Sequence, residues 1–217
     1  MNSDQLVQAI PRLKKTLKGK RTPVVTEISK RRDPFRVLVS CLLSLRTRDE
    51  VNGEASHRLF QLADRPETLL QIPLETLEQT IYPVAFFRNK AKSLQAICHS
   101  LIDDHQSQVP RKLDELLQLK GVGRKTANLT VVLGYDDYGI CVDIHVHRIT
   151  NRWGYVQTKT PDETEMALRE KLPKKYWKGI NDLLVTFGQN ICKPISPICS
   201  QCPITEFCDR IGVTKTR

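Results

Sequence analysis

A lysine that follows a pair of glycines is the first candidate for covalent chemistry in this sequence. Gly121 and Gly123 lie on either side of one valine, and Arg124 and Lys125 follow directly. In the first turn of a helix, Lys125 would lie at the positive end of the helix dipole, which disfavours a protonated amine. An unprotonated lysine is a nucleophile that can form a Schiff base with a sugar carbon. Most lysines are solvated charges, and that is the alternative interpretation of Lys125.

An aspartate further along the chain is the second candidate. Asp143 follows three apolar residues in the stretch "ICVDIHVHRITNR", and a helical pattern begins directly after it. A carboxylate in such a position can stabilise positive charge that develops on a nearby carbon. Aspartate is also a favoured helix N-cap, and without Lys125 capping would be the preferred interpretation.

The two glycines predict a tight turn between two helices, because glycine allows a left-handed backbone and the close approach of another group. The N–H groups that open the second helix would be unpaired, with the positive end of the helix dipole behind them. Such a turn suits a phosphate group. Its candidate contacts are Lys120, Gly121, Val122, Gly123 and Arg124. An ordinary helical hairpin with a glycine C-cap is the common alternative.

Four of the seven cysteines lie close together near the C-terminal end, with the spacing C-x6-C-x2-C-x5-C. They are Cys192, Cys199, Cys202 and Cys208. Four thiolates in one short loop can close around zinc or an iron–sulfur cluster, and the spacing alone does not choose between these groups. Four unrelated clustered thiols would be difficult to keep reduced, so a metal site is the preferred interpretation. The other three, Cys41, Cys98 and Cys141, are expected in the core.

The charge of the chain indicates an acidic polymer as its partner. The 217 residues carry a formal net charge of +10, and basic residues are spread from Lys14 to Arg217. Nucleic acid is the leading partner, and a basic surface without a specific partner is the alternative. No apolar run approaches the ~20 residues that span a bilayer, and no signal peptide pattern is present. We therefore expect an intracellular monomer that is cytoplasmic and associated with the nucleoid.

Helical periodicity predicts the elements that position these residues. The stretch "PFRVLVSCLLSL" starts with Pro34 and is apolar on almost every side, which favours a buried helix, although its valines also allow a buried strand. In "NKAKSLQAICHSLIDDH" the apolar residues follow helical spacing. Asp49 is expected to cap the helix that follows it, and another helix is expected near Pro161. Because no stretch alternates as a strand would, we predict an all-α fold.

The stretches "LKGVGRKTAN" and "VDIHVHRITNR", with the cysteine spacing, resemble the endonuclease III family of base-excision DNA glycosylases. The resemblance extends from "PFRVLVSCLLS" to Cys208. It implies that Lys125 attacks C1′ of the damaged nucleoside's deoxyribose and that Asp143 assists departure of the base. The imine would make the 2′ proton acidic enough for β-elimination of the 3′ phosphate. Lys125 therefore implies a bifunctional glycosylase and AP lyase that removes oxidised pyrimidines from duplex DNA.

The same resemblance implies a cofactor and further DNA contacts. The cysteine spacing matches the 4Fe-4S loop of the family, where the expected role is structural. The loop between the first two cysteines is usually more basic in relatives, and here only Lys193 would contact a phosphate. The family inserts side chains into the duplex from two loops, where this chain has Arg46 and, as the apolar wedge, Phe86 or Phe87. We choose Phe86 for the wedge.

The predicted architecture is two helical domains on either side of a DNA-binding groove. A six-helix domain with the helix-hairpin-helix would span 27–137, and a cluster domain would combine 1–26 with 138–217. Lys125 and Asp143 would face each other across the groove. Two alternatives remain: a glycosylase of the same superfamily with another lesion or mismatch as target, and a non-catalytic helix-hairpin-helix DNA-binding protein.

Overall fold

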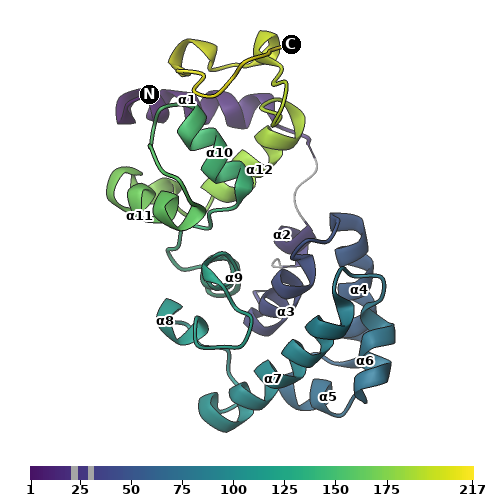
Figure 1. The fold of residues 1–217 in the computed structure, drawn as a ribbon. Coiled ribbons are helices and arrows are strands. Elements are labelled where there is room, and N and C mark those ends of the chain that lie inside the picture. Colours follow the sequence, from purple (N-terminus) through teal and green to yellow (C-terminus); the bar gives the residue numbers. More distant parts are fainter. Residues whose placement is uncertain (21–23, 29–31) are drawn as a thin grey trace. The chain divides into compact units, whose positions relative to one another are not determined.

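The computed structural model describes residues 1–20, 24–28 and 32–217. Within these ranges every regular element is helical and there is no strand, which confirms the predicted all-α fold (Figure 1). The first half contains α1 (Ser3–Thr16), α2 (Val24–Ile28), α3 (Pro34–Ser44), α4 (Asp49–Leu62), α5 (Pro66–Leu70), α6 (Leu74–Ile81) and α7 (Phe87–His105). The second half contains α8 (Leu113–Leu116), α9 (Arg124–Leu129), the π-helix η2 (Thr130–Gly134), α10 (Ile144–Arg152), α11 (Pro161–Lys171) and α12 (Ile180–Asn190). Three short 3₁₀ turns are η3 (Lys174–Tyr176), η4 (Cys199–Gln201) and η5 (Thr205–Phe207).

The contacts within the chain divide it into two compact units. Unit 1 comprises Met1–Pro23 and Ile140–Arg217, and unit 2 comprises Val24–Gly139. The domains expected from the sequence, 27–137 and 1–26 with 138–217, remain a proposal about how the chain is organised in function. The units are described separately below.

Helix α3 is the central helix of unit 2. The carboxylate of Asp33 caps it by accepting from the N–H groups of Phe35 at 3.0 Å and Arg36 at 3.1 Å. Its apolar side chains are buried on every side, and it packs against α4, α7, α9 and η2. The helical interpretation of this stretch is therefore confirmed, and the strand alternative is wrong. Helix α7 buries its predicted stripe of Leu94, Ile97, Cys98 and Leu101 in the same core.

The expected cap of α4 is wrong by one residue. Its N-cap is Arg48, which has an extended backbone and makes no capping hydrogen bond through its side chain. Asp49 is already helical, and with Glu50 it lies in the first turn. There the two carboxylates favour the helix through its dipole and not as a cap.

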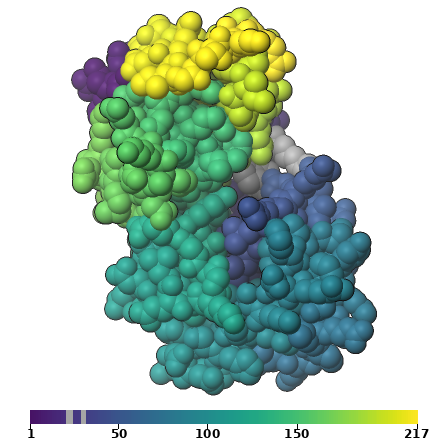
Figure 2. Space-filling model, in the orientation of Figure 1, coloured from purple at the N-terminus to yellow at the C-terminus, as the bar shows by residue number. Residues whose placement is uncertain are grey.

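Unit 1 is built around α1, α10 and α12. Asn2 caps α1, because its side chain accepts from the N–H of Gln5 at 2.9 Å while the Gln5 side chain accepts from the N–H of Asn2. Trp153 and Phe187 pack with ring centroids 6.2 Å apart in the core of this unit. Figure 2 shows the purple residues of α1 beside the yellow C-terminal residues. Within this C-terminal segment, η5 contacts α1.

None of the helices in the described ranges combines the length and the apolar character needed to cross a membrane. The longest is α7, with 19 residues. Its exposed face carries charged side chains, as expected for a helix at the surface of a compact unit.

Candidate active site

The turn between α8 and α9 belongs to unit 2 and holds the first candidate residues. Gly121 has a φ of +80°, a backbone conformation that residues with side chains rarely adopt. Val122 is buried, and its N–H donates to the carbonyl of Leu119 at 3.0 Å. Gly123 is the N-cap of α9, and a Cβ built on it would meet no atom within 4 Å. The buried side chain and the hydrogen bond of Val122 therefore hold the turn in place, and Gly123 leaves room for close approach of a ligand.

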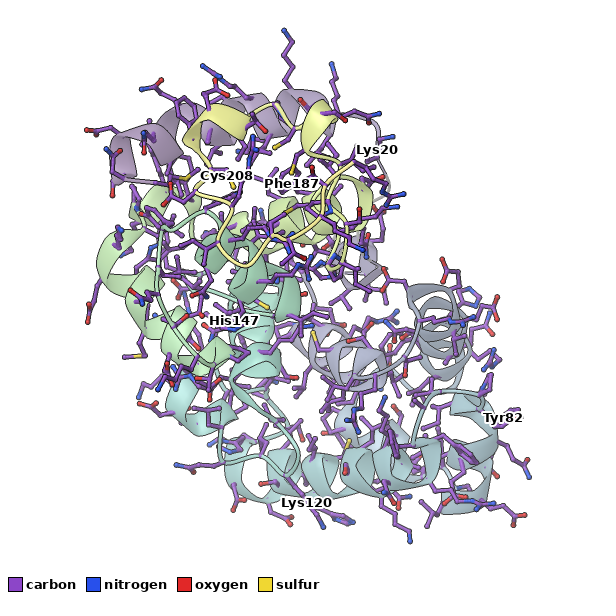
Figure 3. The ribbon with its side chains drawn as sticks, turned by 45° about the horizontal axis from the view of Figure 1, so that its top comes forward. Lys20, Tyr82, Lys120, His147, Phe187 and Cys208 are labelled. Atoms are coloured by element: carbon purple, nitrogen blue, oxygen red, sulfur yellow. The ribbon has the colours of Figure 1, made fainter. Side chains whose placement is uncertain are left out.

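Lys125 is the second residue of α9 and is half-buried. Burial raises the pKa of the Cys41 thiol to about 12, and the charge of Lys125 acts against that rise. Lys125 therefore lies close to α3, while Cys41 is a neutral thiol of the core. Arg124 beside it is also half-buried, and Lys120 is exposed before the turn (Figure 3).

Asp143 belongs to unit 1 and is the N-cap of α10. Its Oδ1 atom accepts from the N–H groups of His145 at 2.8 Å and Val146 at 2.9 Å. The side chain is only 9% exposed. The structure therefore confirms the capping role, which fixes the orientation of the carboxylate without excluding a second role. Because Lys125 lies in the other unit, the predicted pairing of the two residues across a groove remains a proposal.

The four C-terminal cysteines line one small cavity of unit 1, together with Arg152 and Phe187. Cys192 is buried and the other three are half-buried. Among the described residues, however, no group of three or more histidine, cysteine or acidic side chains is arranged to hold a metal ion. Burial, together with the neighbouring thiols, raises the pKa of the Cys208 thiol to about 11, although a backbone hydrogen bond at Arg210 acts against this rise. Nearby cationic charge would favour the thiolate forms that bind metals.

The buried guanidinium of Arg152 tests whether this cavity fits a metal–thiolate group. Arg152 is 6% exposed and donates to the Cys192 sulfur at 3.2 Å and to the carbonyls of Lys193 and Pro194, each at 2.9 Å. Within the described part of the chain, no carboxylate is among the partners of this cation. A buried charge needs an opposite charge nearby, and a cluster of metal-bound thiolates would supply one. The residues therefore fit an anionic metal centre.

The C-terminal residues close over the same loop. The N–H of Ser200 donates to the carbonyl of Arg217 at 3.0 Å, and the N–H of Arg217 donates to the carbonyl of Pro197 at 2.9 Å. The N–H of Ile211 donates to the carbonyl of Arg152 at 3.0 Å. Cys208, labelled in Figure 3, lies between these contacts in the sequence. The cysteine loop is thus tied both to α10 and to the C-terminal residues.

Arg46 and Phe86 meet at the surface of unit 2. Both have left-handed backbones, with φ values of +56° and +58°, and both side chains are exposed. The guanidinium carbon of Arg46 lies 5.6 Å from the centre of the Phe86 ring. Phe87 points elsewhere, since it packs against the core and makes an edge-on contact of 5.3 Å with the Tyr82 ring. Of the two phenylalanines, Phe86 is therefore the one available at the surface.

The sequence reasoning missed Lys90, which joins the two loops that carry Arg46 and Phe86. Its ammonium donates to the carbonyl oxygens of Leu43 at 2.8 Å and Leu45 at 2.6 Å. Burial lowers its pKa to about 8. In the sequence "FFRNKAK" this residue has the same surroundings as any solvated helix lysine, so only the fold distinguishes it.

Comparisons with known proteins identify related sequences. A family model described as an HhH-GPD superfamily base excision DNA repair protein matches residues 39–174. The endonuclease III of Thermotoga maritima is 44% identical over 180 residues, which cover 83% of this chain and 84% of that protein. The endonuclease III of Bacillus subtilis is 40% identical over 190 residues, which cover 84% of this chain and 87% of that protein.

Solved structures show the same likeness. A non-covalent endonuclease III–DNA complex matches with a TM-score of 0.86 and 33% identity, over 97% of this chain and 96% of that chain. A trapped endonuclease III–DNA covalent intermediate matches with a TM-score of 0.84 and 32% identity, over 97% of both chains. A thermostable thymine-DNA glycosylase, at 22% identity and a TM-score of 0.83 over 95% of both chains, shares the fold.

Proposed function

Since the chain belongs to the endonuclease III family within the HhH-GPD superfamily of base excision DNA repair proteins, we propose that it is a bifunctional DNA glycosylase and AP lyase. Its substrates are oxidised pyrimidines in duplex DNA. The observation that carries the proposal is Lys125, half-buried in the first turn of α9 directly after the glycine turn. An endonuclease III trapped as a covalent intermediate with DNA, at 32% identity, supports a nucleophile in this fold.

Lys125 supplies the nucleophile of the first step. Its amine forms a bond to C1′ of the deoxyribose, and the bond between C1′ and the base breaks, with its electron pair leaving on the base. A proton passes to the departing base. The bond between C1′ and the ring oxygen O4′ then breaks, its electron pair leaves on O4′, which takes a proton, and the lysine nitrogen becomes doubly bonded to C1′ as a protonated imine. The imine acidifies the 2′ proton, whose removal expels the 3′ phosphate. One amine therefore serves both glycosylase and lyase steps.

Asp143 stabilises the positive charge that develops on the sugar as the base departs. Its position at the start of α10 suits this role, because both cap hydrogen bonds reach the same oxygen, Oδ1, and hold the carboxylate in one orientation. Preorganised charge of this kind lowers the barrier without reorganisation during the reaction. In this proposal, Lys125 and Asp143 act on the same deoxyribose of the bound DNA.

The cofactor is a 4Fe-4S cluster held by the four C-terminal cysteines, Cys192, Cys199, Cys202 and Cys208. The shared cavity and the buried charge of Arg152 support an anionic metal centre, and the resemblance of the cysteine spacing to the family's 4Fe-4S loop favours this cluster over zinc. When bound, the cluster supplies a structural cross-link for the loop, and Arg152 balances part of its negative charge. The chemistry at C1′ depends on Lys125 and Asp143 and does not pass through the cluster.

The DNA is held by phosphate contacts and opened by inserted side chains. The turn with Lys120, Gly121, Val122, Gly123 and Arg124 binds a phosphate, and Lys193 contributes a weaker contact from the cysteine loop. Arg46 pairs with the orphaned base, and Phe86 fills the space beside it. The exposure of Phe86, which is 58%, supports its choice over Phe87.

A panel of duplexes, each with one modified base, tests this function. We expect release of oxidised pyrimidines accompanied by a strand break at the same site. Base release without a break would contradict the lyase activity, and preferential release of a mismatched or oxidised purine would favour another glycosylase of the superfamily. Binding to every duplex without any base release would favour the non-catalytic DNA-binding alternative.

A further inference from the structure

Lys90 on α7 binds the end of α3 through three hydrogen bonds. Its half-buried ammonium donates to the carbonyls of Leu43 and Leu45, at 2.8 and 2.6 Å, and to Thr47 Oγ1 at 3.2 Å. The carbonyls at the end of a helix lack partners within that helix and carry its negative dipole end. A cation from a neighbouring helix satisfies both conditions. Lys90 therefore links α7 to the end of α3 and to the start of the loop after it.

Thr47 extends this arrangement to a second loop. Its Oγ1 atom, which receives the hydrogen bond from Lys90, also accepts from the N–H of Ala85 at 3.2 Å. Residues 45–48 follow α3, whereas Ala85 lies in the segment between α6 and α7. One ammonium and one hydroxyl group thus join two loops that are far apart in the sequence.

Arg46 and Phe86 lie directly next to these anchored residues. Arg46 is flanked by Leu45 and Thr47, and Phe86 follows Ala85. Both have left-handed backbones, which persist in residues with side chains only where the surroundings hold them. With the guanidinium carbon 5.6 Å from the ring centre, the two side chains present one combined cation–π surface.

We propose that Lys90 is a positioning residue that holds Arg46 and Phe86 as a single unit for opening the DNA duplex. The inference rests on the proposed function, because it concerns how the damaged base is taken out of the duplex. We do not expect Lys90 itself to contact DNA, because its ammonium donates its hydrogen bonds to groups of the protein. Without it, the two loops would move independently, and the ring would lose its fixed place beside the guanidinium.

The experiment compares Lys90→Met with the matched control Lys92→Met, which removes an exposed lysine from the same helix. Two substrates separate duplex opening from the chemistry of Lys125. One is a duplex with an oxidised pyrimidine, and the other is a single strand with an abasic site, which needs no duplex opening. For Lys90→Met we expect base release from the duplex to fall about tenfold, as for loss of hydrogen bonds from a charged group. Borohydride trapping on the single strand should change less than about twofold, and Lys92→Met should match the unmodified protein on both substrates.

A double-mutant cycle distinguishes positioning from general stabilisation. With Lys90 present, the effects of Arg46→Ala and Phe86→Ala on duplex cleavage should be strongly non-additive, because the two side chains act together. In the Lys90→Met background they should become additive. An unchanged coupling, or unchanged duplex cleavage by Lys90→Met, would overturn the inference while leaving the proposed function intact.

Thr47→Val provides a second variant that keeps the side-chain shape and removes the bridging hydroxyl group. It should reduce duplex cleavage in the same direction and to a smaller extent, again with trapping on the single strand retained. Equal losses on duplex and single strand in both variants would show that Lys90 and Thr47 only support the fold, and would overturn the inference. Absence of trapping by the unmodified protein on either substrate would instead contradict the proposed function.

Discussion

Two regions of this protein, the pair of loops around Arg46 and Phe86 and the cysteine loop, are each held by one buried or half-buried cation, and the two cations have different partners. In unit 2, Lys90 donates to two backbone carbonyls and a threonine hydroxyl group. In unit 1, Arg152 donates to two carbonyls and to the sulfur of Cys192. The hydrogen-bond partners of Lys90 are all oxygen atoms of the polypeptide, whereas one partner of Arg152 is the sulfur of a proposed metal ligand.

The difference indicates which loop depends on a cofactor. The loops around Arg46 and Phe86 are anchored at the ends of α3 and α7, within a continuous apolar core. The cysteine loop contains only the short turns η4 and η5 and few buried apolar side chains of its own. A segment with so little apolar burial needs another source of stability, and metal binding is a common one. The loops around Arg46 and Phe86 should therefore be independent of iron, and the cysteine loop should depend on it.

The largest effect should follow loss of one cysteine ligand. Cys202→Ser should lose the iron and the visible absorbance of the cluster, and should expose residues 191–217 to proteolysis, because metal binding and folding of such loops are coupled. Iron content, absorbance and limited proteolysis measure this together, with Ser200→Ala in the same loop as the control. Colourless unmodified protein with one zinc ion would contradict the cluster assignment.

The next effect concerns the counter-charge. Arg152→Met removes a buried cation beside the thiolates, and we expect a loss of about 3 kcal/mol in the free energy of unfolding and faster release of iron to a chelator. Arg12→Met is the matched control, since Arg12 forms an exposed ion pair with Glu206 that solvent screens. Equal effects of both substitutions on the free energy of unfolding and on iron release would contradict the role of Arg152 as the counter-charge of the thiolates.

The glycine turn of unit 2 offers a test without a cofactor. Because a Cβ on Gly123 meets no protein atom within 4 Å, Gly123→Val should alter the free energy of unfolding by less than about 1 kcal/mol. It should still weaken binding to all duplexes alike, by about tenfold, because the added methyl groups keep phosphate away from the turn. Binding measured on damaged and undamaged duplexes decides this. A loss limited to damaged DNA would mean that the turn reads the base.

The smallest effect is a pH dependence specific to Lys90. Burial lowers its pKa in the folded protein to about 8, below the 10.5 of the free side chain. Between these values the unfolded chain binds more protons than the folded one, so the free energy of unfolding should rise with pH across this window. After allowance for solvent screening we expect about 1 kcal/mol. The rise should be missing in Lys90→Met and present in Lys92→Met, as chemical denaturation at several pH values can show.

The sequence predicted the elements of the fold better than the contacts between them. The apolar residues after Pro34 and the stripe of α7 predicted buried helices, because periodicity and burial are local properties of the sequence. The cap of α4 was predicted one residue too late. Asp49 has a side chain that commonly caps helices, but Arg48 is the residue with the extended backbone of the N-cap. Lys90 could not be identified, since its partners are carbonyls more than forty residues away in the chain.

Trapping of the imine is the sharpest test of Lys125 as the nucleophile. If the amine of Lys125 attacks C1′, borohydride added during the reaction should reduce the imine and join protein and damaged DNA in one covalent species. Lys125→Gln keeps much of the side chain's length, so it should bind DNA nearly as well while losing both the trapped species and strand cleavage. Lys92→Gln should retain both. Undiminished trapping by Lys125→Gln, or no trapping by the unmodified protein on any oxidised pyrimidine or abasic site, would contradict the account.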